Sequence, residues 1–281
     1  MGDPIEWHPA RMLLRERAET DRENNQHTAA PQLALIILNQ PLRDLATLEV
    51  LWSNSFLRVA ADGGADRLLR ASQEGQQNGG SSSTLLSQSG LDVIIGDLDS
   101  LTNEARQYFT TAASSHHTKI IHDPDQYSTD FGKAVKYIRS AAASPPGTTP
   151  ADIVAMGGLG GRVDQGLSQL HHLYLFQTDP TYAEGRLFLV SGESLTFLLK
   201  AGRHRVHVRE EGAEDVFGKY VGIIPIKEPS VITLRGFEWD VTDWKTEFGG
   251  MMSTSNHVLP DSRVVEVETT KDVLFTISLK G

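Results

Sequence analysis

The chain has 281 residues, with 36 acidic and 26 basic side chains, a formal net charge of −10 and no cysteine. Non-specific nucleic-acid binding needs a basic surface, so the charge excludes that class of partner, and disulfides and thiolate metal sites are excluded as well. No apolar stretch approaches the roughly 20 residues of a membrane span, and the charged segment 1–25 does not resemble a secretory signal. We therefore expect a soluble, cytoplasmic protein without nucleic-acid or membrane partners, built from one large domain or two modest ones.

Residues 1–30 are expected to form a partly ordered N-terminal extension. From residue 31 to 184, apolar runs of strand length alternate with segments of helical periodicity, which predicts crossover connections and a mostly parallel α/β sheet domain. The segments 72–90 and 143–151 are rich in Gly, Ser, Pro or Gln and are expected to be loops, the first of them a flexible insertion. The expected strands are 33–38, 56–61, 91–95, 118–122 and 152–156, and the expected helices are 45–52, 64–71, 102–112, 128–142 and 164–177.

After about residue 185 the pattern changes to short β-rich runs separated by Gly, Pro and charged turns, with no long helical pattern between them. This sequence pattern predicts an antiparallel β-sandwich or barrel-like second domain over residues 185–281. The runs are RLFLVS, LTFLL, HRVHV, YVGIIPI, VITLRGF, SRVVEVE and VLFTISL.

Three apolar runs of the first domain end in turns that carry aspartate, beginning at Ala61, Gly96 and His122. The carboxyl ends of parallel strands meet at one edge of a sheet, where ligands bind. Carboxylates gathered there repel one another unless a cation lies among them. The pattern predicts a Mg²⁺ site that holds a polyphosphate.

Among these turns, GDLDS at 96–100 gives the strongest local signal. In extended backbone, side chains two residues apart point the same way, so Asp97 and Asp99 are expected to face one cation while Leu98 points into the protein. The alternative is an ordinary acidic turn.

Two other segments combine acidic residues with phosphate-binding features. Asp62 is followed by Gly63 and Gly64, which allow close backbone approach to a ligand at a helix N-terminus, although an ordinary turn is the alternative. The segment 125–130 opens a helix with Ser128 or Thr129 as its N-cap. There Asp130 has a candidate metal role, against simple complementation of the helix dipole, and Gln126 and Thr129 are candidate hydrogen-bonding partners of nucleotide or phosphate.

The fourth apolar run, DIVAM, ends in a glycine-rich loop at 157–161 that is followed by Arg162 and Asp164. This loop lacks the ending of a Walker A loop and the spacing of the dinucleotide fingerprint. Its backbone N–H groups and Arg162 still suit phosphate, with a merely flexible loop as the alternative.

In the second domain, Trp239 and Trp244 lie near the polar segment 253–256 in the sequence, and a tryptophan there could stack on a flat cationic ring. Core packing of either tryptophan is the alternative. The histidines show no HExxH or similar metal-binding spacing, and the pairs His116-His117 and His171-His172 are expected to be structural or exposed and not metal ligands.

Taken together, these blocks resemble the thiamine pyrophosphokinase family, in a eukaryotic, fungal-like form. The resemblance covers residues 31–280 and depends on five blocks in the family's order. They are ADGGADRL (61–68), GDLDS (96–100), DQYSTDFGKA (125–134), GGLGGRVDQ (157–165) and STSN (253–256).

The resemblance implies an α/β domain that binds ATP and Mg²⁺, a β-sandwich domain, and a homodimer that holds thiamine between one subunit's α/β domain and its partner's β domain. It implies transfer of the pyrophosphoryl group of ATP to the thiamine hydroxyl group, with AMP as the other product. Asp62, Asp97, Asp99 and Asp130 resemble the acidic Mg²⁺ cluster, with Asp97 or Asp99 as a candidate proton acceptor. Asp164 resembles the aspartate near thiamine's aminopyrimidine, and Arg162 a phosphate ligand. The thiamine side is matched by Trp239, Ser253, Ser255 and Asn256.

Some positions depart from the family pattern, but none of them removes a core carboxylate, so an active enzyme is expected. Tyr127 stands where many members carry an acid, His171 stands where asparagine is frequent, and the stretch 72–90 is longer than compact members need. Two rival functions stay open, a Mg²⁺-dependent phosphohydrolase and a non-catalytic thiamine or nucleotide sensor.

Overall fold

The computed structural model describes residues 2–15, 32–77, 90–111, 117–140 and 150–280. The chain divides into two compact units. The first, here called the α/β unit, comprises Asp21–Phe176 and Tyr182–Gly192, and the second, called the β unit, comprises Met1–Thr20, Gln177–Thr181 and Glu193–Gly281. In the described residues, no helix has both the length and the apolar character needed to cross a membrane.

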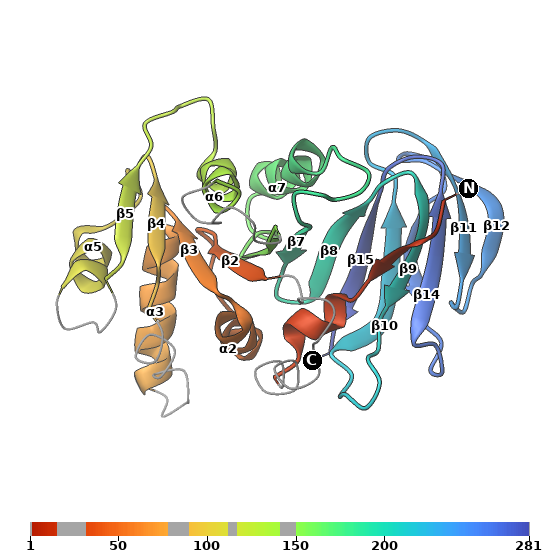
Figure 1. The fold of residues 1–281 in the computed structure, drawn as a ribbon, viewed down its shortest axis with the longest axis horizontal. Helices are drawn as coiled ribbons and strands as arrows, with labels where there is room; N and C mark the ends of the chain where they lie inside the picture. The colour runs from red at the N-terminus through yellow and green to blue at the C-terminus, as the bar shows by residue number, and fades with distance from the viewer. Residues whose placement is uncertain (1, 16–31, 78–89, 112–116, 141–149, 281) are drawn as a thin grey trace. The chain divides into compact units, whose positions relative to one another are not determined.

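The α/β unit contains a parallel sheet (Figure 1). Within the described chain its strands lie in the order β5-β4-β3-β2-β6-β7. They are β2 (Leu33–Ile37), β3 (Leu57–Ala61), β4 (Val93–Gly96), β5 (Lys119–His122), β6 (Asp152–Met156) and β7 (Leu187–Val190). All residues of β2, β4 and β7 are buried. This is expected for strands of a parallel sheet that is covered on both faces.

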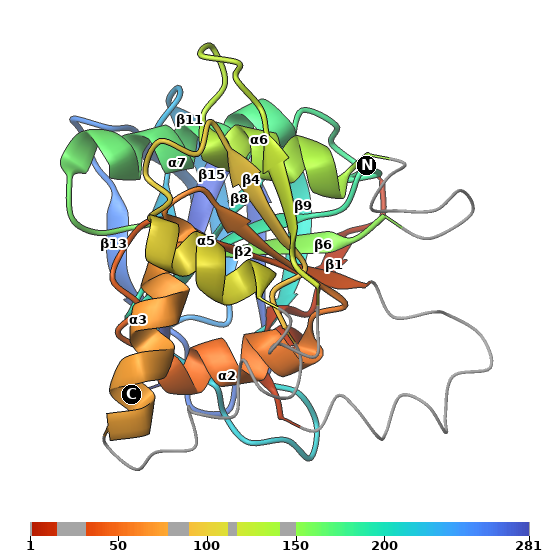
Figure 2. The ribbon, with the colours of Figure 1, turned by 90° about the vertical axis from the view of Figure 1, so that its left-hand side faces the viewer.

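Helices cover both faces of this sheet (Figure 2). α6 (Asp130–Ile138) and α7 (Val163–Phe176) lie on one face, and α2 (Leu45–Asn54) and α3 (Gly64–Gln77) lie on the other. α5 (Asn103–Thr110) contacts α3. Side chains cap three of these helices at the N-terminus: Asp44 caps α2, Thr102 caps α5 and Thr129 caps α6.

The order of the strands creates a topological switch point between β2 and β6. The chain runs from β2 outward through β3, β4 and β5, and then returns to place β6 on the other side of β2. The connections that leave β2 and β6 therefore diverge at the carboxyl edge, which is where open α/β sheets form their binding crevice.

The β unit contains two groups of hydrogen-bonded strands. One runs in the order β13-β10-β15-β8 with antiparallel pairing, and the other runs in the order β1-β9-β14-β11-β12 with only β1 parallel to its neighbour. The short helix η1 (Pro9–Leu13) follows β1. The strands are β1 (Ile5–Trp7), β8 (Ser194–Leu199), β9 (Gly202–His207), β10 (Phe217–Ile224), β11 (Ser230–Arg235), β12 (Val241–Thr246), β13 (Ser253–His257), β14 (Val264–Thr269) and β15 (Val273–Leu279).

The expected fold class is confirmed, with a parallel α/β sheet followed by antiparallel strands, but two local expectations are wrong. Residues 72–77 continue helix α3 instead of starting a loop, and Gln73 reaches Glu104 of α5. β7, expected in the second domain, pairs in parallel with β6 because its buried apolar residues extend the first sheet. Within the expected, partly ordered N-terminal extension, residues 5–13 form β1 and η1, and residues 16–30 lie outside the described residues. The rest of the expected insertion, residues 78–89, lies outside the described residues.

Candidate active site

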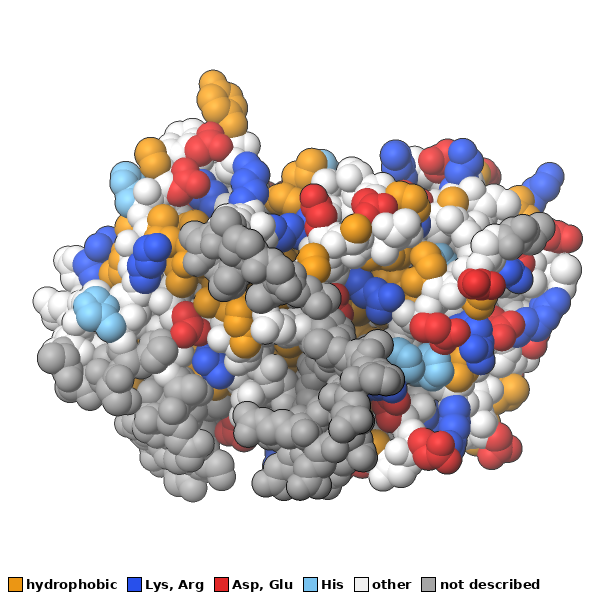
Figure 3. Space-filling view, viewed as in Figure 1, with side chains coloured by type: hydrophobic (Ala, Val, Ile, Leu, Met, Phe, Trp, Pro, Cys, Tyr) orange, Lys and Arg blue, Asp and Glu red, His pale blue; other side chains and the backbone are white. Residues whose placement is uncertain are grey.

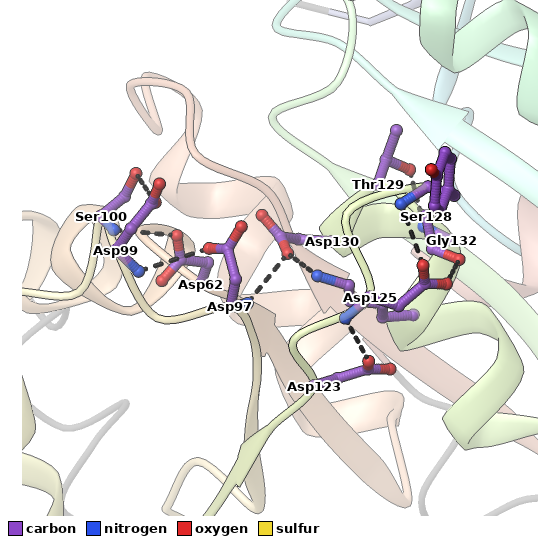
Figure 4. Close-up of polar contacts among 12 residues, drawn as sticks. Asp62, Asp97, Asp99, Ser100, Asp123, Asp125, Ser128, Thr129, Asp130 and Gly132 are labelled. Carbon is purple, nitrogen blue, oxygen red and sulfur yellow. Dashed lines mark hydrogen bonds and ion pairs between the residues drawn. The ribbon is translucent and has the colours of Figure 1, made fainter.

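The carboxylates of Asp62, Asp97 and Asp130 gather at the carboxyl edge of the parallel sheet (Figure 4). Asp62 follows β3, Asp97 follows β4, and Asp130 is the first residue of α6. One oxygen from each carboxylate lies within 4.8 Å of the others. The ligand oxygens of an octahedral Mg²⁺ site lie about 2.0–2.1 Å from the metal and so at most about 4.2 Å from one another, which means that a modest inward movement of these carboxylates would form such a site.

Gly96, the last residue of β4, leaves the space that this convergence needs. A Cβ atom at this position would lie 2.8 Å from Cβ of Asp62 and 3.0 Å from Oδ1 of Asp130. Its backbone is ordinary, so glycine is required here by close approach and not by a special φ angle. A larger residue would push two of the three acids apart.

Asp62 is the most buried of the three acids, with 3% of its surface exposed. Burial raises its pKa to about 6, and the charges of Asp130, Asp97 and Asp99 add to the rise, while the N–H of Ser100, which donates to Oδ2 at 3.1 Å, opposes it. Oδ1 of Asp62 is buried and has no hydrogen-bond partner among the described residues. A buried acceptor without a partner beside two further carboxylates fits a cation site.

Asp99 does not join this cluster, contrary to the expectation of a shared face with Asp97. Leu98 has a φ of +64°, so the segment is a turn and not extended strand, and the side chains of its neighbours diverge. Asp99 is exposed, accepts a hydrogen bond from the hydroxyl group of Ser100, and donates its backbone N–H to Asp97. Asp123 and Asp125, from the turn after β5, bind N–H and hydroxyl groups of their own loop (Figure 4).

A cavity of about 610 Å³ opens beside the acidic cluster, within the α/β unit. Of the other residues expected at this site, Gly63, Gln126, Thr129 and Arg162 line it. Gly64 does not line it; a Cβ there would lie 2.2 Å from the carbonyl oxygen of Ile37, so this glycine serves helix–strand packing. Asp164 also lies outside the lining and pairs with Arg162, whose hydrogen bonds lower the pKa of the Asp164 carboxyl group.

Sequence reasoning missed several polar residues that line this cavity. Asn39 and Gln40 follow β2 at the switch point and could have been found by applying the strand-end rule to amides as well as acids. Gln169 and His172 come from α7, three residues apart and so on one face of the helix. The structure places His172 in this lining with 4% of its surface exposed.

The β unit has a separate pocket of about 340 Å³. It is lined by Trp239, Trp244 and the segment 253–256, which contains Ser253, Ser255 and Asn256. Trp239 is 53% exposed and is therefore not a core residue. The Asn256 carboxamide is engaged with the backbone of Trp239, accepting from its N–H at 3.1 Å and donating to its carbonyl oxygen at 2.9 Å. Asn256 thus holds Trp239 in place.

Two family models match consecutive parts of the chain. The catalytic domain of thiamin pyrophosphokinase matches residues 48–183, and the vitamin B1 binding domain of thiamin pyrophosphokinase matches residues 203–274. The chain belongs to the thiamine pyrophosphokinase family. The two matched regions contain the acidic cluster and the Trp239 pocket respectively.

Relatives in the thiamine pyrophosphokinase family match over most of their length. Thiamine pyrophosphokinase 3 of Oryza sativa is 35% identical over 88% of this chain and 87% of its own. Thiamine pyrophosphokinase 1 of Arabidopsis thaliana is 33% identical over 91% of this chain and 90% of its own. The Saccharomyces cerevisiae thiamine pyrophosphokinase is 26% identical over 96% of this chain and 90% of its own. The chain is therefore a pyrophosphate-transferring kinase that acts on thiamine.

Solved structures of thiamine pyrophosphokinases share the fold. The yeast structure gives a TM-score of 0.78 at 23% identity and covers 100% of this chain and 92% of its own. The Candida albicans structure gives a TM-score of 0.74 at 22% identity, with coverage of 100% and 95%.

Proposed function

We propose that ATP is the pyrophosphoryl donor and that its polyphosphate binds with Mg²⁺ in the cavity of the α/β unit, held by Asp62, Asp97 and Asp130. The observation that carries this proposal is the convergence of three carboxylates, one of which, Asp62, has a buried oxygen atom without a hydrogen-bond partner among the described residues. Bound Mg²⁺ would neutralise phosphate charge and assist departure of AMP. The products are thiamine diphosphate and AMP.

The residues around the acidic cluster supply the remaining contacts for the polyphosphate. Arg162 is exposed at the cavity and offers a planar cation, and it is currently paired with Asp164, which phosphate oxygens could replace. The N-termini of α6 and α7 add N–H groups and positive dipole ends. Gln126 at the cavity wall is a candidate for contacting the nucleotide.

We propose that thiamine binds in the Trp239 pocket of the β unit. Thiamine carries a permanent positive charge on a flat ring, which an exposed indole face can stack against. Ser253 and Ser255 offer hydroxyl groups in the pocket wall. The 53% exposure of Trp239 in a single chain also supports a homodimer, in which a partner subunit covers the bound ring and the thiamine site lies at the subunit interface. A cytoplasmic location fits the cysteine-free composition.

The test is a coupled assay for AMP release by the purified chain with ATP, Mg²⁺ and thiamine. Transfer requires that AMP and thiamine diphosphate appear together and only when thiamine is present. Phosphate release that does not need thiamine would instead indicate the phosphohydrolase, and saturable binding without turnover would indicate the sensor.

Two isosteric variants then test which acids hold the metal. Asp97→Asn removes a charge from the cluster and is expected to lower kcat by at least about a hundredfold, in the range reported for lost electrostatic groups. Asp99→Asn changes an exposed acid outside the cluster and is expected to cost less. Equal losses would place Asp99 in the reacting site after all, and near-normal turnover in Asp97→Asn would remove it from the metal site.

A further inference from the structure

The hydroxyl group of Thr129 has two partners in the structure. Its oxygen accepts the N–H of Gly132 at 3.0 Å, which makes Thr129 the N-cap of α6. The same oxygen lies 2.7 Å from Nε2 of His172, on α7. Since Asp130 is the next residue after the cap, these contacts bear directly on where the acidic cluster places its third carboxylate.

The second contact of His172 fixes the direction of that hydrogen bond. Nδ1 of His172 lies within hydrogen-bond distance of the carbonyl oxygen of Ser168, which can only accept, so Nδ1 carries a proton. Burial lowers the pKa of His172, which favours the neutral ring, and a neutral ring with its proton on Nδ1 has a lone pair on Nε2. The hydroxyl group of Thr129 must therefore donate to Nε2.

This direction changes the role expected of Thr129. Its only proton is committed to His172, so the hydroxyl group cannot also donate to a phosphate oxygen, which is an acceptor. What remains is its capping role. The cap fixes the first turn of α6, and with it the backbone of Asp130.

We propose that His172 is a positioning residue for pyrophosphoryl transfer, which holds the Thr129 hydroxyl group in its capping orientation and so sets Asp130 beside Asp62 and Asp97. This inference rests on the proposed role of those three acids in binding Mg²⁺. The proposed role of His172 requires no contact with the reacting groups. The residue acts through Thr129.

The hydrogen bonds that join Ser168, His172 and Thr129 are here called the relay. Packing holds the imidazole ring in the orientation that the relay requires. The ring lies between Phe131 and Phe176, with centroid distances of 4.9 and 5.8 Å. The backbone of α6 also packs against this contact, since a Cβ atom at Gly132 would lie 3.5 Å from Nε2 of His172 and, more tightly, 3.3 Å from Oγ1 of Thr129. A ring enclosed in this way cannot rotate freely, so both of its nitrogen atoms stay directed at their partners.

Substitutions at the two residues separate the relay from simple packing. His172→Phe keeps a ring but removes both hydrogen bonds, while His172→Gln keeps an acceptor at a reach similar to that of Nε2. Thr129→Val removes the hydroxyl group with little change of shape, and Thr129→Ser keeps it. The double variant His172→Phe/Thr129→Val completes a thermodynamic cycle.

The measurements are the Mg²⁺ concentration that gives half-maximal activity, the Mg²⁺-dependent rise in Tm, and the KM for thiamine. We expect His172→Phe and Thr129→Val each to raise the half-saturating Mg²⁺ concentration by up to about tenfold, the size of one hydrogen bond. The double variant is expected to lose no more than either single variant, and His172→Gln and Thr129→Ser to stay within about twofold of the wild type. The KM for thiamine should not change.

Several results would overturn the inference. These are a normal Mg²⁺ response in Thr129→Val or His172→Phe, effects that multiply in the double variant, or failure of His172→Gln to restore the response. If His172→Phe does not fold, the inference is still tested by the other variants, Thr129→Val, Thr129→Ser and His172→Gln. The Tm measurement needs no turnover, so it tests the relay even if the wild type releases no AMP with thiamine, a result that would refute the proposed function instead.

Discussion

The Nζ atom of Lys133 lies 3.2 Å from Oδ1 of Asp130, one helical turn along α6. The Lys133 side chain is 1% exposed, whereas that of Asp130 is 31% exposed. A buried ammonium group needs a partner to offset its lost hydration, and Asp130 supplies one. The pair also brings a positive charge to one edge of a cluster that otherwise gathers negative charge.

Lys133→Met tests this charge balance. Removing the ammonium group leaves Asp130 facing Asp62 and Asp97 without its cation, so stability without Mg²⁺ should fall. Asp130 is partly exposed, so we expect a loss of roughly 1–2 kcal/mol, below the range of about 3–5 kcal/mol for breaking a fully buried pair. Added Mg²⁺ should restore part of it, so the rise in Tm on adding Mg²⁺ is larger than in the wild type.

The control for Lys133→Met lies one turn further along the same helix. Lys136 is exposed and contacts Ser128, and Lys136→Met should change stability by no more than about 0.5 kcal/mol. If the two variants give the same Mg²⁺ response, the buried lysine does not balance the acidic cluster.

The raised pKa of Asp62 gives a dependence of stability on pH. Its pKa is about 6 in the folded chain against 3.8 for an ordinary aspartate, so between these values the folded state binds more protons than the unfolded state. Without Mg²⁺, the contribution of Asp62 to the unfolding free energy therefore falls as pH rises from about 4 to about 6. Asp62→Asn should remove this slope, which urea unfolding at a series of pH values would measure. An equal slope in the variant would contradict the assignment.

The same group links Mg²⁺ binding to protons. Because Mg²⁺ needs the ionised carboxylate, the half-saturating Mg²⁺ concentration should rise as pH falls below about 6, at most about tenfold per pH unit for one competing proton. Titrations followed by Tm would detect this. A flat dependence between pH 7 and pH 5 would indicate that Asp62 is not a ligand.

Strand and helix alternation predicted the α/β unit well because each element carries its own periodic signal. The buried run of β2 and the amphipathic face of α6 are local features that sequence reasoning finds directly. Continuation of α3 through residues 72–77 was missed because a polar segment without an apolar face resembles a loop. Its contact with α5, between Gln73 and Glu104, appears only in the folded chain.

The acidic site was predicted in outline, and its details depended on information that the sequence pattern lacks. The strand-end rule pointed to Asp62 and Asp97 because it concerns the topology of the sheet, and Asp130 came from the segment that opens helix α6. The same rule also pointed to the turn after β5, where Asp123 and Asp125 bind groups of their own loop instead. It could not exclude Asp99, since that depends on the positive φ of Leu98, a residue type that rarely adopts it. It also passed over His172, whose partner Thr129 is 43 residues away in the chain.

Acidic and basic side chains are interspersed over the described residues of the face drawn in Figure 3.

In the β unit, Trp239→Ala should mainly weaken thiamine binding. The indole is half exposed at the pocket, and its backbone is clamped by Asn256, so it is already oriented for stacking. We expect the KM for thiamine to rise about tenfold or more, as an estimate from stacking of about 1–2 kcal/mol, with a small change in kcat. Trp239→Phe keeps an aromatic face and should lose less. An unchanged KM in Trp239→Ala would shift the assignment to Trp244, which lines the same pocket.

The start of the chain is expected to contribute to the stability of the β unit. Trp7 of β1 is fully buried, stacks on Phe197 at a centroid distance of 4.6 Å, and donates its indole N–H to His204 at 3.1 Å. Trp7→Ala should therefore cost about 3–5 kcal/mol, read as a lower urea midpoint for unfolding. Glu6→Gln is the control, because Glu6 is 41% exposed and its pairs with Arg205 and His207 should each contribute at most about 1 kcal/mol. Equal midpoints for the two variants would mean that residues 5–7 do not pair with β9 in solution.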